Sequence, residues 1–365
     1  MRVLHILTDT NIGGAGKYLL ALAESKTDFA PEIKVILPPE SKMKSLLEDT
    51  GIEVTEDKNI AEKSFSLKAI VSLLPKIIKI KPRIVHTHAS FAGRCAAKLL
   101  GIPVVHTKHY CIYPMDIKQT RFPHKQFQGF INHNFSDKVI ATSPEVEKGL
   151  VETGTRESHI KTIFNGIAPL SPLSKEEKQA SREMWGIKPH SYIISQVARL
   201  DEIKGHDHTL DAAKLLADED IVFLLAGTGP LEEHLKKRIK DEAINNVLMT
   251  GFVSNVAELL SITDIQINMS YTETTCIALL EGMSLSLPSI ATKGGGNPYV
   301  IKDGENGLLI DCGDSAALAD AIVKLKNSHE IYDNMALNAA STYVGRFKAE
   351  KMTEELFSVY MRLLK

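Results

Sequence analysis

The chain has 365 residues, 44% of them hydrophobic and 24% charged, which is enough apolar sequence to bury the cores of about two domains. A net charge of −2 and a pI near 6.7 argue against general electrostatic binding of nucleic acid. No apolar stretch approaches the roughly 18 residues of a membrane span, and the N-terminal apolar run is too short for a signal peptide. We therefore expect a cytoplasmic protein with reduced cysteines, since the four cysteines form no C-x-x-C pair.

The chain begins with an apolar segment, residues 3–7, that is typical of a buried strand. The loop after it contains Gly13-Gly14-Ala15-Gly16, and a helix is expected from residue 17 to about 24. A strand, a glycine-rich loop and a helix in this order are typical of a phosphate-facing turn, with Gly14 and Gly16 as candidate contacts. The alternative is a tight turn that packs the helix on the sheet.

Two stricter nucleotide motifs do not fit this loop. A P-loop would need glycine where the chain has Asn11 and serine or threonine where it has Tyr18. A G-x-G-x-x-G motif from Gly14 would need glycine at Leu19. The sequence therefore does not support an ATPase or an NAD-dependent enzyme.

Strands and helices alternate through the rest of the first half. We expect strands at 32–37, 52–55, 83–87, 104–107 and 137–142, and helices at 42–50, 66–79, 91–100 and from Pro144. This alternation predicts a doubly wound parallel sheet that binds ligands at the carboxyl ends of its strands. Residues 111–133 are expected to be irregular and to contact an acceptor.

Two features of this half have alternative interpretations. His86, His88, His106 and His109 lie near two strand ends, but no carboxylate ligand lies beside them, so no metal site is predicted. The basic end of the 66–79 helix could contact anionic lipid at the inner face of a membrane, or be a solvated face; it comprises Lys76, Lys79, Lys81 and Arg83.

A Pro- and Ser-rich linker at 168–174 leads into a second set of alternating elements. We expect strands at 192–197, 221–226, 247–251, 265–269 and 287–292, and helices at 175–185, 231–243, 256–261, 276–286 and 347–364. Arg199 and Lys204 follow the first of these strands. Two cations at a strand end, one of them able to bind two phosphate oxygens at once, suit a diphosphate.

The segment 265–311 carries two carboxylates, Glu273 in a loop and Glu281 in the helix after it. Thr274 or Thr275 is expected to cap this helix. Carboxylates accept pairs of hydroxyl groups, which favours ribose and sugar diols as ligands. The glycines at 294–296 are expected to let the backbone approach a phosphate closely.

Several motifs now stand in a fixed order along the chain. They are N-G-I (165–167), R-L-x-x-x-K-G (199–205), G-x-G-P (227–230), E-x7-E (273–281), P-S-I-A-T-x-x-G-G-x-P (288–298) and D-G-x-N-G-L-L (303–309). Over nearly its whole length the chain thereby resembles the retaining glycosyltransferases of family 4. It departs from the family pattern at Ala168 and at Tyr299, where relatives often have acids.

The resemblance implies a GT-B fold: α/β, with two doubly wound Rossmann-like domains facing across a cleft. Residues 1–168 would form an acceptor-side domain, residues 175–345 a nucleotide-sugar-binding domain, and residues 346–365 a helix returning to the first domain. Arg199 and Lys204 would stabilise the departing diphosphate. Glu273 and His109 would contact the sugar of the donor, and Glu281 would contact its ribose. Six further residues would contact the nucleotide or its phosphates: Thr275, Gly14, Gly16, Gly227, Gly229 and Phe252.

The resemblance also implies the reaction. A sugar would pass from a nucleotide-diphosphate sugar, most commonly a UDP-sugar, to a glycan, lipid-linked or small-molecule acceptor in cell-envelope polysaccharide or glycolipid synthesis. No cofactor, metal or nucleic acid is expected to take part. Two alternatives remain: a nucleotide-sugar epimerase or hydrolase of the same fold, and a catalytically silent nucleotide-sugar-binding protein.

Overall fold

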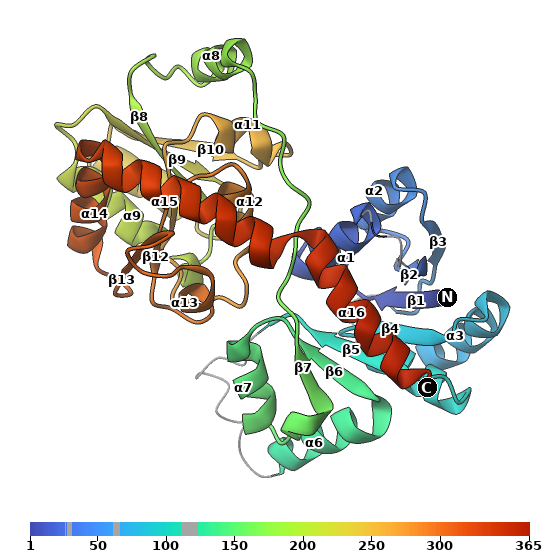
Figure 1. The fold of residues 1–365 in the computed structure, drawn as a ribbon. Coiled ribbons are helices and arrows are strands. Elements are labelled where there is room, and N and C mark those ends of the chain that lie inside the picture. The colour runs from blue at the N-terminus through green and yellow to red at the C-terminus, as the bar shows by residue number, and fades with distance from the viewer. Residues whose placement is uncertain (26, 28–30, 61–65, 111–122) are drawn as a thin grey trace. The chain divides into compact units, whose positions relative to one another are not determined.

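The computed structural model describes all residues except 26, 28–30, 61–65 and 111–122, and the chain divides into two compact units (Figure 1). Unit 1 comprises residues 1–168 together with 347–365, and unit 2 comprises residues 169–346. Each unit has its own parallel sheet and its own hydrophobic core.

Unit 1 is built on a seven-stranded parallel sheet with the order β3-β2-β1-β4-β5-β6-β7 (Figure 1). The strands are β1 (Arg2–Leu7), β2 (Glu32–Leu37), β3 (Glu53–Glu56), β4 (Ile84–His88), β5 (Val104–Lys108), β6 (Lys138–Ala141) and β7 (Ile160–Thr162). The chain starts in the middle of the sheet, winds to one edge, and then crosses β1 to wind to the other. This is the doubly wound arrangement that the alternating pattern predicted.

Helices cover both faces of this sheet. One face packs against α1 (Gly14–Glu24), α2 (Met43–Asp49) and α16 (Ala349–Leu363). The other packs against α3 (Leu67–Ile80) and α4 (Phe91–Leu99). The remaining helical segments of unit 1 are α6 (His124–Phe135), α7 (Pro144–Glu152) and the 3-10 turn η2 (Glu157–His159). Ser143 caps α7 by accepting a hydrogen bond from the Val146 N–H, and Pro144 stands at the first position, as predicted.

Two expectations for unit 1 were wrong. The helix after β1 begins at Gly14 rather than at residue 17, so Gly14 and Gly16 lie in its first turn. The segment expected to be irregular contains α6, and its remaining residues 111–122 lie outside the described part of the chain. In α6 the absence of a side chain at Gly129 lets the helix approach the backbone at Gly154, a long-range contact that local periodicity does not reveal.

The C-terminal helix α16 packs in the core of unit 1. Met352, Leu356 and Val359 are buried in the same cluster as residues of β1 and α1. Tyr360, also buried there, places its hydroxyl 2.5 Å from His86 Nδ1 on β4, while His86 Nε2 lies 2.6 Å from Thr107 Oγ1 on β5. Apolar burial and one buried polar contact together hold α16 on the sheet.

Replacing Tyr360 by phenylalanine is expected to lower the free energy of unfolding by about 1–3 kcal/mol, because His86 Nδ1 would stay buried without its partner. Urea denaturation followed by circular dichroism measures this change. Tyr299→Phe is the control, because Tyr299 is 37% exposed, and it should change the free energy by less than about 0.5 kcal/mol. An equal effect of the two substitutions would contradict the prediction.

Unit 2 has a six-stranded parallel sheet with the order β10-β9-β8-β11-β12-β13. The strands are β8 (Tyr192–Val197), β9 (Ile221–Ala226), β10 (Val247–Gly251), β11 (Ile265–Asn268), β12 (Ser289–Thr292) and β13 (Gly307–Ile310). Its helical segments are α8 (Lys175–Met184), η3 (Glu202–Lys204), α9 (His206–Leu215), α10 (Glu232–Asp241), α11 (Val256–Ser261), α12 (Ile277–Ser284), α13 (Asn297–Val300), α14 (Ser315–Asn327), α15 (His329–Thr342) and η4 (Tyr343–Phe347). The strands predicted for this half all form.

Two hydrophobic clusters pack on the sheet of unit 2. The larger includes buried residues of α9, α10, α14 and α15, and the smaller includes residues of α11 with the segments beside it. None of the described helices is both long enough and apolar enough to cross a membrane.

Candidate functional site

The candidate site lies at the carboxyl edge of the unit 2 sheet. The first strand, β8, has β9 on one side and β11 on the other, so the winding direction reverses between β8 and β11. Ligands of doubly wound sheets bind at such a reversal. Arg199 and Lys204 follow β8, and Glu273 follows β11, so the fold brings the two predicted cations and the first carboxylate to the same point.

Lys204 and Glu273 form the centre of this site. Lys204 Nζ donates to Glu273 Oε1 over 2.6 Å, and both side chains are largely buried, with 22% and 11% of their surface exposed. The same oxygen accepts hydrogen bonds from Asn268 Nδ2 (3.1 Å) and Ser270 Oγ (2.8 Å). Three donors on a single oxygen hold the carboxylate in one orientation.

The electrostatics agree with a charged pair. Burial lowers the pKa of Lys204 and the Glu273 carboxylate raises it, and the net result lies above the ordinary value, so the ammonium stays charged. Burial and the same carboxylate raise the pKa of Cys276 to about 12. A thiol of that pKa is protonated near neutral pH, which removes Cys276 as a candidate nucleophile.

Hydrogen bonds from the Gln196 side chain and the Tyr271 backbone hold the loop of Lys204 in place. The Lys204 carbonyl accepts from Gln196 Nε2 (2.7 Å), and Gln196 Oε1 accepts from Thr209 Oγ1 (2.6 Å). The Tyr271 N–H donates to the Ile203 carbonyl, which joins this loop to the loop of Glu273. The cation and the carboxylate are therefore placed by two loops that are also bonded to each other. A pocket of about 510 Å³ lies next to these loops, lined by Gly205, His208 and Tyr271 among others, but neither Lys204 nor Glu273 lines it.

The glycines of this edge bring loops together, which is a structural reason for glycine at these positions; the close approach of a phosphate remains a prediction. A Cβ at Gly294 would lie 2.5 Å from the Tyr271 carbonyl oxygen, and one at Gly296 would lie 1.6 Å from that of Thr274. The Gly296 N–H also donates to the Glu273 carbonyl over 2.8 Å. The glycines at 294–296 are thus required for the close approach of their loop to the loop that carries Glu273.

The glycines of the G-x-G-P loop (227–230) likewise let their loop pack closely against a neighbouring segment. Gly227 has φ of +147°, and a Cβ there would lie 1.9 Å from the Ala198 carbonyl oxygen. A Cβ at Gly229 would lie 2.3 Å from the Leu200 carbonyl oxygen. This loop is pressed against the segment that carries Arg199, so Gly227 and Gly229 position a candidate ligand-binding loop.

Replacing Gly296 by alanine is expected to lower the free energy of unfolding of unit 2 by about 1–3 kcal/mol, because the new methyl would overlap the Thr274 backbone. Trp185, the one tryptophan of the chain, lies in unit 2 and reports its unfolding in urea by fluorescence. The control is Gly345→Ala, which also lies in unit 2, because nothing lies within 4 Å of that position and it is already helical. This control substitution should leave the free energy of unfolding unchanged or raise it by up to about 1 kcal/mol. A neutral Gly296→Ala would refute the packing role.

Arg199 and Phe252 lie at the same edge but are exposed. Arg199 has 70% of its side chain exposed and lies 3.8 Å from an Asp201 oxygen, outside the Lys204–Glu273 pair. Phe252, directly after β10, is 71% exposed. Both are available to a ligand, which is consistent with the diphosphate and nucleobase roles predicted for them.

The helix after Glu273 differs from its prediction in two ways. Its N-cap is Cys276, without a side-chain hydrogen bond, so neither Thr274 nor Thr275 caps it. Thr275 is buried in the preceding loop instead. The helix spans Ile277–Ser284 rather than residues 276–286, with Glu281 about one turn from its N-terminus, and Glu281 is 7% exposed. The ribose contact of Glu281 and the nucleotide contact of Thr275 remain predictions.

In unit 1 the two candidate glycines have different surroundings. A Cβ at Gly16 would lie 2.6 Å from Met43 Sδ, so this glycine lets α1 pack against α2. This contact is with a neighbouring helix, not with the sheet named in the alternative. Gly14 faces open space. A ligand contact is therefore sterically free at Gly14, whereas Gly16 has a structural reason to be glycine.

Histidines form a buried chain across the sheet of unit 1. His109 Nε2 lies 2.8 Å from His88 Nδ1, and His88 Nε2 lies 3.1 Å from His5 Nδ1, from three neighbouring segments of the fold. Burial lowers the pKa of His5 to about 3, and burial followed by the Lys108 charge lowers that of His109 to about 3. His109 is therefore neutral near pH 7, and its ring is oriented by His88. The contact predicted between His109 and the sugar remains a prediction.

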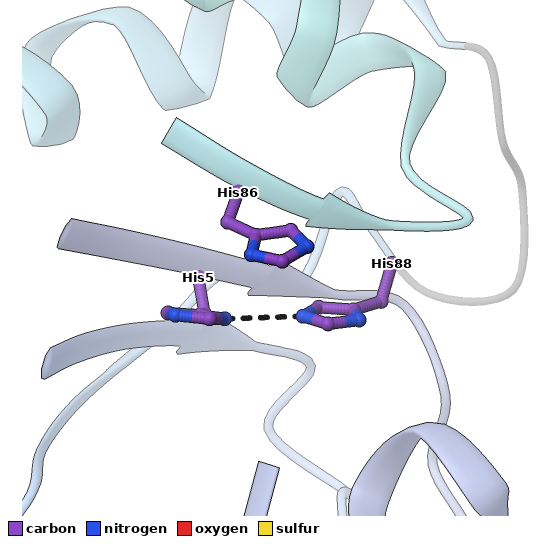
Figure 2. A group of neighbouring side chains, drawn as sticks. All are labelled: His5, His86 and His88. Atoms are coloured by element: carbon purple, nitrogen blue, oxygen red, sulfur yellow. Dashed lines mark hydrogen bonds between the residues drawn. The ribbon is translucent and has the colours of Figure 1, made fainter. Parts of the chain in front are cut away.

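His5, His86 and His88 are the one group among the described residues that could hold a metal ion, with ring nitrogens within 4.8 Å of one another. Figure 2 shows the ring of His86 beside the hydrogen-bonded pair of His5 and His88. His86 stacks on His88 with 17° between their planes and 4.6 Å between their centroids. Imidazole lone pairs lie in the ring plane, so stacked rings cannot direct them at one ion. Both nitrogens of His86 are also occupied by Tyr360 and Thr107, and this geometry does not fit a three-histidine metal site.

Sequence reasoning missed Asn268 and Ser270, which hold the Glu273 carboxylate, and His5, which ends the histidine chain. A signal existed for the first two, since polar residues at the exit of an apolar parallel strand often lie in a ligand crevice. His5 lies inside a buried strand, and only the strand order brings it beside β4.

Two family models match the chain. Residues 12–169 match "Glycosyltransferase Family 4", and residues 177–342 match "Glycosyl transferases group 1". The chain is 30% identical over 294 residues to the putative glycosyltransferase EpsD of Bacillus subtilis, covering 76% of each protein. It is 29% identical over 232 residues to the N-acetyl-alpha-D-glucosaminyl L-malate synthase of Bacillus anthracis, covering 63% of this chain and 61% of that relative.

Solved structures share the complete fold. HepE of Anabaena in complex with UDP superposes with a TM-score of 0.86 at 22% identity, over 99% of this chain and 100% of that one. WaaG, a glycosyltransferase involved in lipopolysaccharide biosynthesis, superposes with a TM-score of 0.70 at 15% identity, over 99% of each chain. The two doubly wound sheets together are the GT-B fold.

Proposed function

Because the chain belongs to glycosyltransferase family 4, we propose that it transfers a sugar, with retention of configuration, from a nucleotide-diphosphate sugar bound at the carboxyl edge of the unit 2 sheet. The Lys204–Glu273 pair carries this proposal, because a buried, charged pair at the winding reversal offers a cation for phosphate and an oriented carboxylate for hydroxyl groups. UDP is the nucleotide we favour, since it is bound in the HepE complex.

The roles proposed for the site residues follow from the charge that develops on the departing nucleoside diphosphate. As the bond from the anomeric carbon to the diphosphate breaks, negative charge develops on the phosphate oxygen. Lys204 is preorganised to stabilise that charge, and the exposed Arg199 can close on the same phosphates. Preorganised stabilisation of this kind is worth about 3–4 kcal/mol for each donor. In this proposal Glu273 holds sugar hydroxyls, Glu281 the ribose and Phe252 one face of the base, and no metal is needed.

For the acceptor we propose a glycan or lipid-linked sugar of the cell envelope. UDP-Gal:alpha-D-GlcNAc-diphosphoundecaprenol alpha-1,3-galactosyltransferase of Escherichia coli, 25% identical over 311 residues, acts on such a lipid-linked acceptor by its name. The Bacillus anthracis relative is named as a synthase that uses malate, a small acceptor. The acceptor class is therefore the part of the proposal that most needs a direct assay.

A thermal-shift panel of UDP, GDP, ADP and UMP, each with and without EDTA, tests the donor site. A ligand at 100 times its Kd stabilises by about 2.7 kcal/mol, so one diphosphate should raise Tm clearly in EDTA. The shift should disappear in Lys204→Met and persist in Lys236→Met, a control on exposed α10. No shift with any nucleotide would refute the proposal. With the matching nucleotide sugar, the anomer of the product detected first by NMR then tests retention.

A further inference from the structure

Helix α3 of unit 1, labelled in Figure 1, carries apolar side chains that the core does not cover. Ala69, Leu73 and Ile77 are fully buried against the sheet. Leu67, Val71 and Ile78 are 70%, 69% and 57% exposed. Their spacings of four and seven residues place them on one stripe of the helix, about 120° or more from the centre of the buried face. The stripe is not part of the unit 1 core.

The charged residues of α3 and of the segment directly after it all have one sign. Residues 67–80 contain three lysines and no acid, and Lys81 and Arg83 follow directly. Lys76 pairs with Asp57 over 2.8 Å, on the side turned away from the stripe. The other four cations, Lys68, Lys79, Lys81 and Arg83, are exposed and form no ion pair among the described residues. The patch is therefore apolar along its centre and positive along one border and one end.

Phe127 and Phe130 on α6 are 58% and 56% exposed and form a pair, but no other described helix carries three such residues on one stripe. Leu337 on α15 is also 70% exposed, but no second large exposed hydrophobic residue lies on that helix, and scattered residues of this kind are normal. On α3 three residues share one stripe, and the neighbouring α4 ends with Leu99, again 70% exposed. Since β4 and β5 are parallel neighbours, α3 and α4 both end at the amino edge of the sheet.

We propose that the stripe of Leu67, Val71 and Ile78, with its bordering cations, binds the surface of a membrane that contains anionic lipid. An apolar stripe flanked by lysines inserts among acyl chains while the cations stay at the phosphate level. A second copy of the chain is a poorer occupant, because α3 against α3 would bring the unpaired lysines of both copies together. The proposal is independent of the donor site in unit 2.

Co-sedimentation of the full chain with vesicles tests this surface. Vesicles of phosphatidylcholine with phosphatidylglycerol should bind the protein, and vesicles of phosphatidylcholine alone should bind it at least about tenfold more weakly. Val71→Glu and Ile78→Glu should each reduce binding about tenfold or more, and Lys79→Glu should reduce it together with its dependence on salt. Leu337→Glu is the matched control, because it adds the same charge at an equally exposed leucine in unit 2.

The three positions on α3 are exposed, so the variants should keep the wild-type Tm and the wild-type response to nucleotides. Retention of both while vesicle binding falls supports the membrane surface. Equal binding to the two vesicle types, or equal losses in Leu337→Glu and Val71→Glu, would overturn it. Light scattering that showed a dimer broken by Val71→Glu would assign the stripe to a second copy instead.

Discussion

Replacing Lys204 by methionine is expected to lower kcat/KM for the nucleotide sugar by about 10²–10³-fold. Methionine keeps much of the length of the side chain and removes the charge that faces the departing diphosphate. Loss of one preorganised donor of this kind costs about 2.7–4 kcal/mol of transition-state stabilisation. The assay is release of nucleoside diphosphate from the donor, which can be followed with water as the acceptor before the natural acceptor is known.

Folding and activity must be separated in this experiment. Without Lys204, Glu273 keeps Asn268 and Ser270 as partners but loses its counter-charge, and some loss of stability is expected. Circular dichroism and urea denaturation show whether the variant is folded at the assay temperature. Lys236→Met, which removes an exposed surface pair on α10, should leave kcat/KM unchanged. A folded Lys204→Met enzyme with more than about a fifth of wild-type kcat/KM would contradict the role proposed for Lys204.

A double-mutant cycle extends the test to Glu273. If the two groups act as one unit, Glu273→Gln alone and the double variant should lose similar amounts of activity, because each single change already removes the attraction of opposite charges across the 2.6 Å contact. Losses in kcat/KM that multiply exactly would instead show that Lys204 and Glu273 act on separate parts of the donor. Either result shows whether Lys204 and Glu273 act together or act separately on the diphosphate and the sugar of the donor.

The free energy of unfolding of unit 1 is expected to fall steeply as the pH drops below 6.5. Four histidines of this unit are buried and His109 is half-buried, and loss of water around the ring is the main cause that lowers the pKa of each below the ordinary value; they are His5, His86, His88, His106 and His109. In the unfolded chain the same groups titrate near 6.5. Below that pH the unfolded state binds protons that the folded state does not, so stability is lost as the pH falls.

The size of this effect follows from the number of groups. Each histidine contributes up to about 1.4 kcal/mol per pH unit once the unfolded form is protonated, and the five together contribute up to about 7 kcal/mol per pH unit. A domain with about 5–15 kcal/mol of stability should then unfold between about pH 5.5 and 4.5. Urea denaturation at a series of pH values measures the slope.

The two units can be followed separately in one sample. Circular dichroism reports both, whereas the fluorescence of Trp185 reports unit 2. As the pH falls, part of the circular-dichroism transition should move to lower urea while the fluorescence transition moves less. His106→Asn should reduce the pH slope, and His190→Gln, at an exposed position of unit 2, should not. Coincident transitions with a slope near that of a single histidine would show that these rings titrate normally in the fold.

Much of the architecture follows from local pattern. Apolar runs such as 221–226 can form strands buried on both faces, and the expected strands are separated from one another by helices, which requires parallel strands with crossover connections. Parallel strands place all their carboxyl ends at one edge. The sequence alone therefore places Arg199, Lys204 and Glu273 at a common edge of the unit 2 sheet, without coordinates.

Other features depend on which loops meet, and local pattern does not contain that information. Gly296 was expected to admit a phosphate, which remains a prediction, and its missing side chain admits the Thr274 backbone, because two loops from neighbouring strands cross there. Asn268 and Ser270 became partners of Glu273 only when the chain turned back after β11. The start of α12 at Ile277 likewise follows from the packing of the preceding loop, which overrode the capping preference of threonine.

The sequence by itself determined the fold class, the family and the edge at which the candidate residues lie, because hydrophobic periodicity and strand direction are properties of neighbouring residues. The tertiary structure alone decided that Lys204 pairs with Glu273, that His109 rests on His88 and His5, and that α3 leaves an apolar stripe uncovered. Each of these is a distance or a burial between segments far apart in the chain. Such quantities are set by the packing of the whole unit against water, and they exist only once the unit has folded.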